Sequence, residues 1–281
     1  MVDTGEGKES YIPYLEEALN QTADFSQQII SDIILTHRHR DHIQGLPSVL
    51  ALLRRLWPGE KADFRPPRIH KYPLPPQSPD VILQAVLDQL PADSFIPPED
   101  GSVIHQLQDR QIIHGSDSSL QVLHTPGHTT DSICLYLPEE NTLFTADTVL
   151  GHGTAVFEDL TTYMSSLRLL LQLVSSNHLM TLYPGHGPVV KDGPKLIDEY
   201  SRHRMEREAQ IVQLLSVPTP SGNAWRVEEL VATMYADYPR SLWGPAAHGV
   251  LLHLMKLKTE QRVEHLEGEG EQSTWVLKDK L

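Results

Sequence analysis

The chain has 281 residues, of which 40% are hydrophobic and 21% are charged, so it can bury a sizeable core and is not disordered throughout. It contains no run of about 18 uncharged apolar residues, so we expect no transmembrane helix. The lone Cys134 excludes an internal disulfide framework and a cysteine-rich zinc site. The net charge of −14 argues against a general nucleic-acid binder, whose surface would carry a basic patch.

The first predicted elements lie before residue 60. Residues 14–19 indicate a short helix, and the apolar residues 29–35 are typical of a buried strand. Residues 42–57 carry apolar side chains at helical spacing, and Pro58 and Gly59 follow them directly. We therefore expect one helix over 42–57 that ends before this Pro-Gly pair.

A proline-rich segment follows, over residues 58–100, and we interpret it as a long surface insertion with one helix within residues 81–90. Strands and helices alternate after it, which indicates a layered α/β domain. The strands are predicted at 103–107, 120–124, 132–137, 143–144 and 180–183, with a helix at 160–173.

The pattern changes near Pro194, where amphipathic helices replace the alternation. Helix, helix, helix and a β-hairpin are typical of a small winged-helix-like unit. We therefore expect an α/β catalytic domain over residues 1–195 and a helical, winged-helix-like domain over 196–281. The predicted helices cover 195–215, 227–238 and 246–258, and the hairpin strands cover 262–266 and 273–277.

The segment LTHRHRDH concentrates metal-binding side chains between a predicted strand and a predicted helix. In an extended segment His37 and His39 point to the same side, so the two can share one ion. Asp41 lies at or near the start of the helix, where the turn directs it and His42 to the other side. One short loop can thus supply ligands to two metals. Imidazole and carboxylate together suit zinc, with iron or manganese as alternatives.

Three more motifs each place one possible ligand directly after a strand. TPGHT holds His128, FTADT holds Asp147, and YPGHG holds His186. Any one histidine would be interpreted as a surface or core residue, but the order of the four motifs favours a dinuclear metal site. The seven candidate ligands are His37, His39, Asp41, His42, His128, Asp147 and His186.

This ordered set of motifs resembles the metallo-beta-lactamase superfamily. The resemblance implies an αββα sandwich that holds two zinc ions per chain between its sheet edges. It also implies that Asp3, in the opening V-D-T-G motif, supports the ligand loop from behind. The implied ligands are His37, His39 and His128 for one metal and Asp41, His42 and His186 for the other, with Asp147 bridging.

The resemblance narrows to two groups: the animal beta-lactamase-like protein 2 family and the fungal lactamase-like thioesterases of polyketide pathways. It rests on residues 143–167, on TLYPGHGPVV and on the helical C-terminal unit. Two departures stand out. Residues 58–100 are longer here, and members of the family carry strands before the V-D-T-G motif. We therefore expect a sandwich without its N-terminal edge strands, or a truncated gene model.

Two metals in such a site can share a hydroxide that attacks a carbonyl carbon or a phosphorus atom. Asp147 would orient this nucleophile and Asp41 would accept a proton, which makes both catalytic. We expect an acyl thioesterase, for example one that releases a polyketide from a carrier protein. The alternative is a single-strand-specific endoribonuclease with Arg38 and Arg40 in the ligand loop, and Arg54 and Arg55 nearby, as phosphate contacts. A third interpretation is a non-enzymatic binding module over residues 200–281.

Substrate contacts are expected near the G-H-G-T turn at residues 151–154. His152 and Phe157 are the candidates, against the simpler interpretation of loop geometry and core packing. Cys134 is expected to be core. The first residues resemble neither a secretory signal nor a transit peptide, so a cytoplasmic location without membrane partners is expected, and a β-lactam substrate is disfavoured.

Overall fold

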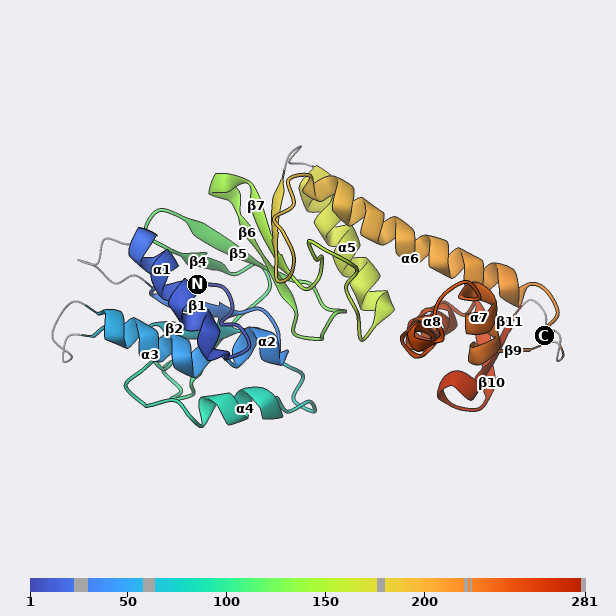
Figure 1. Ribbon diagram of the computed structural model, residues 1–281, viewed down its shortest axis with the longest axis horizontal. Helices are drawn as coiled ribbons and strands as arrows, with labels where there is room; N and C mark the ends of the chain where they lie inside the picture. Colours follow the sequence, from blue (N-terminus) through green and yellow to red (C-terminus); the bar gives the residue numbers. More distant parts are fainter. Residues whose placement is uncertain (23–29, 58–63, 176–179, 220–221, 223, 279–281) are drawn as a thin grey trace. The chain divides into compact units, whose positions relative to one another are not determined.

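A computed structural model of the chain divides into two compact units (Figure 1). The first comprises Met1–Ala155 and Leu179–Asp192, and the second comprises Val156–His178 and Gly193–Leu281. The structure describes residues 1–22, 30–57, 64–175, 180–219, 222 and 224–278.

The first unit contains two sheets, of which one is a short parallel sheet in the order β1-β2-β3. Strand β1 (Asp32–Leu35) is buried at all four positions, as the apolar run predicted. Strand β2 (Arg68–Lys71) lies inside the proline-rich segment, where we predicted only a helix. Strand β3 (Ile104–Gln106) falls within the predicted range 103–107. An isolated parallel bridge pairs Val2 with Ile34 beside β1.

Helices of the first unit pack on this sheet. They are the short η1 (Glu9–Tyr11), α1 (Ile12–Thr22), α2 (Arg40–Ile43), α3 (Leu46–Leu56) and α4 (Val81–Leu87). The leucines and valine on one side of α3 form a single core with the β1 and β2 side chains, as its helical spacing requires. The core includes Ile33, Leu35, Ile43, Leu46, Val49, Leu50, Leu53 and Ile69.

The prediction of one helix over residues 42–57 was wrong, because the segment forms α2 and α3 with a break at Gln44 and Gly45. Gly45 donates a backbone hydrogen bond of 2.9 Å to the carbonyl oxygen of Gly5. The N-terminal segment therefore passes close against this break, and this contact is not visible in local spacing.

The second sheet has five strands in the order β4-β5-β6-β7-β8. Neighbouring strands are antiparallel except for β7 and β8, which are parallel. Cys134 is fully buried in β6, as expected of a core residue. The strands are β4 (Ile112–His114), β5 (Ser119–His124), β6 (Ile133–Leu137), β7 (Thr142–Ala146) and β8 (Thr181–Pro184), with η3 (Pro138–Glu140) between β6 and β7.

The two sheets of the first unit share a core, which makes them the layers of a sandwich. Ile34 of β1 packs in one cluster with Val122 of β5 and Ile133 of β6. Where the sheets meet, the Ile133 backbone N–H donates a hydrogen bond of 3.1 Å to the carbonyl of Thr36. The end of β1 is thereby held against the end of β6, so the loops at this edge of both sheets lie together.

The second unit combines helices with a small antiparallel sheet in the order β10-β11-β9. Trp225, Leu254 and Trp275 belong to its buried core. The short β9 and the end of α7 at Met234 were not predicted. The elements are α5 (Leu160–Ser175), α6 (Gly193–Leu215), β9 (Trp225–Arg226), α7 (Val227–Met234), η4 (Arg240–Leu242), α8 (Trp243–Thr259), β10 (Val263–Glu267), η5 (Gly270–Gln272) and β11 (Thr274–Leu277).

Among the described residues, no helix combines the length and apolar character that crossing a bilayer requires.

Gly45 gives a stability prediction for the first unit. A Cβ atom at this position would lie 1.9 Å from the carbonyl oxygen of Thr4, so backbone must move to admit it. We predict that Gly45→Ala lowers the free energy of unfolding by about 1–3 kcal/mol, as overpacking does elsewhere. Urea unfolding of the metal-free protein measures this change.

The matched control is Gly249→Ala, in the middle of α8, where an added Cβ meets no atom within 4 Å. Alanine is the better helix former by about 1 kcal/mol, so this variant should be as stable as the parent or more stable. An unchanged unfolding midpoint for Gly45→Ala would contradict the proposed close contact between the break and residue 4.

Candidate metal centre

The loop between β1 and α2, together with the first turn of α2, carries four of the candidate ligands. His37 is fully buried two residues after the end of β1, and His39 is the residue that precedes the first turn of α2. Asp41 and His42 then lie in that first turn and belong to a second donor group, while the His42 ring still packs on His37 with centroids 4.0 Å apart. The short extended segment and the short helix thus present two groups of donors from one loop.

The other three candidates also follow strands or strand-connected turns. His128 lies in the turn between β5 and β6, Asp147 directly follows β7, and His186 follows β8. Gly185 gives the carboxylate of Asp147 its space, because a Cβ at position 185 would lie 2.3 Å from Asp147 Oδ1. Gly185, the first glycine of the YPGHG motif, is therefore needed to leave room for the Asp147 carboxylate.

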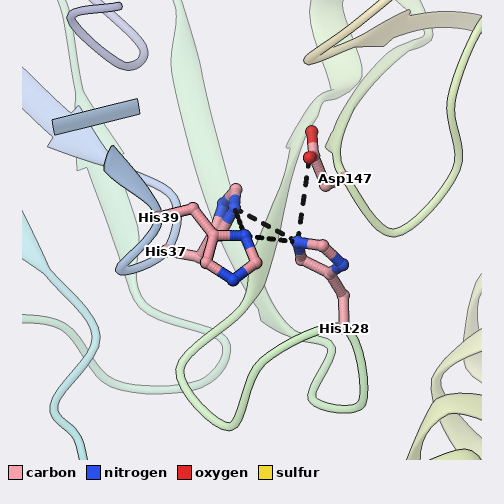
Figure 2. Close-up of side chains that lie close together, drawn as sticks. All are labelled: His37, His39, His128 and Asp147. Carbon is pink, nitrogen blue, oxygen red and sulfur yellow. Dashed lines mark hydrogen bonds and ion pairs between the residues drawn. The ribbon is translucent and has the colours of Figure 1, made fainter. Parts of the chain in front are cut away.

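Three imidazoles converge in the first donor group (Figure 2). His37 Nε2 lies 3.1 Å from His39 Nδ1, and His128 Nε2 lies 3.0 Å from that same His39 nitrogen. The His37 and His128 Nε2 atoms are 3.3 Å apart. Zn–N bonds of about 2.0–2.1 Å in tetrahedral geometry place two ligand nitrogens about 3.3 Å apart, so these three side chains fit a zinc ion.

The second donor group consists of Asp41, His42 and His186. His186 Nε2 lies 3.0 Å from Asp41 Oδ2, and His42 Nε2 lies 3.7 Å from the same oxygen. His42 Nε2 is buried and has no hydrogen-bond partner among the described residues, which is the environment expected for an atom that binds a cation.

Asp147 lies between the two donor groups. Its Oδ2 atom is 3.7 Å from His128 Nε2 and 3.4 Å from His186 Nε2, and its Oδ1 atom is 3.4 Å from His42 Nε2. Oδ1 is buried and, in the described part of the chain, has no hydrogen-bond partner. One carboxylate thus contacts donors of both groups, as a bridging ligand must.

Asp3 and Thr36 hold the ligand loop from behind. Asp3 accepts hydrogen bonds from the Thr36 backbone N–H at 2.7 Å and from its hydroxyl at 2.8 Å. Asp3 Oδ2 also lies 2.7 Å from His42 Nδ1. Since a carboxylate can only accept, His42 donates from Nδ1 and its Nε2 faces Asp147. Thr36 Oγ1 lies 3.0 Å from His37 Nδ1 and orients that ring in the same way.

Of these two supporting residues, Asp3 was predicted from the sequence and Thr36 was missed. The only signal for Thr36 is its place directly after β1 and directly before the first ligand candidate.

The electrostatics of the metal-free site give two of its histidines opposite pKa shifts. Burial and the neighbouring His42, His128 and His39 hold the pKa of His37 far below its usual range, so its imidazole is neutral. Burial also opposes a charge on His42, but the carboxylates of Asp147 and Asp3 outweigh it and raise the pKa of His42 to about 10. In the metal-free protein, therefore, His42 carries a proton that a cation must displace.

A cavity of about 630 Å³ adjoins the second donor group. Asp41, His42 and His186 line one part of it. Its apolar lining comes from the N-terminal segment and from strands β5, β6, β7 and β8, and includes Met1, Val2, Leu120, Leu137, Phe144 and Tyr183. The site can therefore receive a ligand that is partly apolar.

The candidate substrate residues fall in different units. His152 is exposed in the first unit, and it is not among the residues that line this cavity. Phe157 belongs to the second unit, where its ring stacks on Tyr163 with centroids 5.3 Å apart and lies under the Arg204 guanidinium at 4.9 Å. A role for either in substrate binding stays a prediction.

Family models match both parts of the chain. The model of the metallo-beta-lactamase superfamily matches residues 1–186, and the beta-lactamase associated winged helix domain matches residues 227–275. The chain belongs to the metallo-beta-lactamase superfamily. It has the mixed α/β metallo-beta-lactamase fold with a C-terminal winged helix domain, as expected from the sequence.

Superfamily relatives include animal and fungal proteins. A beta-lactamase-like protein 2 homologue of Drosophila melanogaster is 34% identical over 94% of this chain and 79% of its own length. A lactamase-like protein of Aspergillus niger is 31% identical over 98% of this chain and 76% of its own length. An atrochrysone carboxyl ACP thioesterase of Aspergillus fumigatus is 30% identical over 76% of this chain and 41% of its own length.

Solved structures support the superfamily fold. A beta-lactamase domain protein from Burkholderia ambifaria matches 98% of this chain and 81% of its own with a TM-score of 0.69 at 14% identity. A metallo-beta-lactamase family protein from Thermus thermophilus matches 99% of this chain and 89% of its own with a TM-score of 0.62 at 22% identity. At these identities the likeness establishes the fold alone.

The charged state of His42 predicts proton release on metal binding. At pH 7 the metal-free His42 is protonated, since its pKa is raised to about 10, and a metal ligand must be neutral. We predict that zinc binding by the parent protein releases about one proton more than zinc binding by His42→Gln. Calorimetric titration in two buffers of different ionisation enthalpy counts these protons. Equal proton release by the two proteins would contradict the prediction.

Proposed function

We propose that this chain is a dinuclear zinc hydrolase of the metallo-beta-lactamase superfamily that cleaves acyl thioesters. The observation that carries the proposal is the convergence of seven donor side chains into two adjoining groups. His37, His39 and His128 would hold one ion, and Asp41, His42 and His186 the other, with Asp147 contacting both groups. Two zinc ions at such a site supply an activated water and polarise a carbonyl oxygen.

The protein's own contribution is to orient donors and to move protons. The half-buried Asp3 and the buried Thr36 orient the rings of His42 and His37 before any substrate arrives. The side chain of Asp41 is 41% exposed, whereas that of Asp147 is only 10% exposed. Asp41 can therefore accept a proton from the attacking water and pass it to the leaving group or to solvent, while Asp147 stays ionised in place.

Two observations favour an acyl substrate over RNA. The cavity beside Asp41 and His186 is lined largely by apolar side chains, which suits an acyl group better than a phosphate backbone. Two of the arginines near the ligand loop are already engaged: Arg54 pairs with Asp93, and Arg55 makes a two-pronged contact with Glu16. A carrier-bound acyl group is further supported by the name of the Aspergillus fumigatus thioesterase relative.

The first test is hydrolysis of acyl-CoA thioesters by the zinc-loaded protein. We predict turnover of short and aromatic acyl-CoA substrates, and a loss of at least about 100-fold in kcat for Asp147→Asn, which keeps the shape of the side chain but removes its charge. Free-thiol release measures the rate, and metal analysis with circular dichroism establishes loading and folding.

Asp198→Asn is the matched control, since Asp198 is an exposed residue of α6 in the second unit. It should keep full activity. Salt-sensitive cleavage of single-stranded RNA without thioester turnover would replace the proposed substrate by the alternative one. Full activity of Asp147→Asn would reject the dinuclear mechanism for either substrate.

A further inference from the structure

Lys71 is a buried cation beside the metal centre that none of the metal-binding motifs includes. It ends strand β2, and its side chain is only 3% exposed. Its ammonium group pairs with the carboxylate of Asp131, which is completely buried, and lies 3.5 Å from a carboxylate oxygen of Asp80, the residue that caps α4. Lysine is almost never fully buried unless it is paired, and here the two carboxylates provide the pairing.

Asp131 belongs to the turn that carries His128. Thr129 Oγ1 donates a hydrogen bond of 2.8 Å to Asp131 Oδ1, and the Thr129 backbone N–H donates one of 3.1 Å to Ser132 Oγ. Thr129, Asp131 and Ser132 are all buried. The position of His128 is therefore coupled through its neighbour Thr129 to the carboxylate that Lys71 contacts.

The neighbour of Lys71 contacts the other end of the same turn. The ring of Tyr72 stacks on that of His124 with centroids 3.9 Å apart and an interplanar angle of 11°. His124 Nε2 in turn lies 2.9 Å from the carbonyl oxygen of Thr130. Lys71, the last residue of β2, and the following Tyr72 thus contact both ends of a turn that connects β5 and β6 of the other sheet.

We propose that Lys71 is a positioning residue for the metal centre: its ion pair with Asp131 fixes the turn that places His128 Nε2 against His37 and His39. The inference rests on the proposed function only in that the three-histidine group binds a metal ion. Among the described residues, no hydrogen bond or ion pair joins Lys71 to a donor atom, so its contact with the donors runs through the turn. Its charge also contributes to lowering the pKa of His37. This positioning role would also explain why the Lys71–Asp131 pair is buried at a place where two apolar side chains could pack instead.

The experiment measures zinc affinity of the metal-free protein, not turnover. Lys71→Met keeps an unbranched side chain of nearly the same length but leaves the Asp131 carboxylate without its cation, so the turn should shift. We predict a loss of about 10–100-fold in affinity for one of the two zinc ions, the range seen when outer partners of metal ligands are removed. Competition with a chelating dye gives the affinities, and the visible spectrum of the cobalt-loaded protein reports the geometry of the three-histidine group.

Two further variants keep the test decisive. Lys71→Arg retains the charge and should recover most of the affinity, whereas the double variant Lys71→Met with Asp131→Asn removes both buried charges and should fold but still bind one zinc ion weakly. The double variant gives the answer if Lys71→Met alone fails to fold. The matched control is Lys256→Met, which breaks an ion pair with Glu208 in the second unit and should leave both zinc affinities unchanged.

The outcomes separate this inference from the proposed function. Unchanged zinc affinities and an unchanged cobalt spectrum in Lys71→Met or in the folded double variant would overturn the role of Lys71 while leaving the hydrolase proposal intact. Two tight zinc sites without thioester hydrolysis would reject the substrate, and the affinity comparison would still decide on Lys71. A parent protein that binds no zinc would overturn both.

Discussion

The constraint that shapes the first unit is that ring nitrogens and carboxylate oxygens must face one another at a single edge of the sandwich. Three imidazole nitrogens lie within 3.3 Å of each other, and shared protons cannot satisfy all of them. Two further buried candidate ligand atoms, His42 Nε2 and Asp147 Oδ1, have no hydrogen-bond partner among the described residues. Without a cation this arrangement is electrostatically costly. The fold maintains it through contacts around the donors, which explains why so many buried polar residues surround them.

These surrounding contacts tie distant parts of the chain to the ligand loop. Asp3 reaches Thr36 and His42 from the start of the chain, while the break between α2 and α3 lets the same N-terminal segment pass at Gly45. On the opposite side, the end of β2 holds the turn of His128. The donor side chains supply the chemistry, and residues that touch no metal set the geometry in which that chemistry can occur.

Much of the site could be predicted from the sequence because each ligand candidate directly follows a strand or a sharp turn. Such motifs are local, so His37, His39, His128 and Asp147 could be recognised without any knowledge of the tertiary structure. The same logic located the buried strand β1 and the helices of the winged helix domain. The order of the motifs then indicated that the ends of these strands meet.

The parts that were missed depend on contacts between distant residues. Strand β2 is hidden in the proline-rich segment because it pairs with β1 and β3, which lie far from it in sequence. The break at Gly45 follows from the approach of Thr4, and a single lysine at position 71 carries no motif at all. Since the donors belong to loops of both sheets, a cation bound among them joins the two layers as a cross-link does. The free metal concentration around the protein would then set how firmly the sandwich stays closed, and a chelator would act on it as a denaturant.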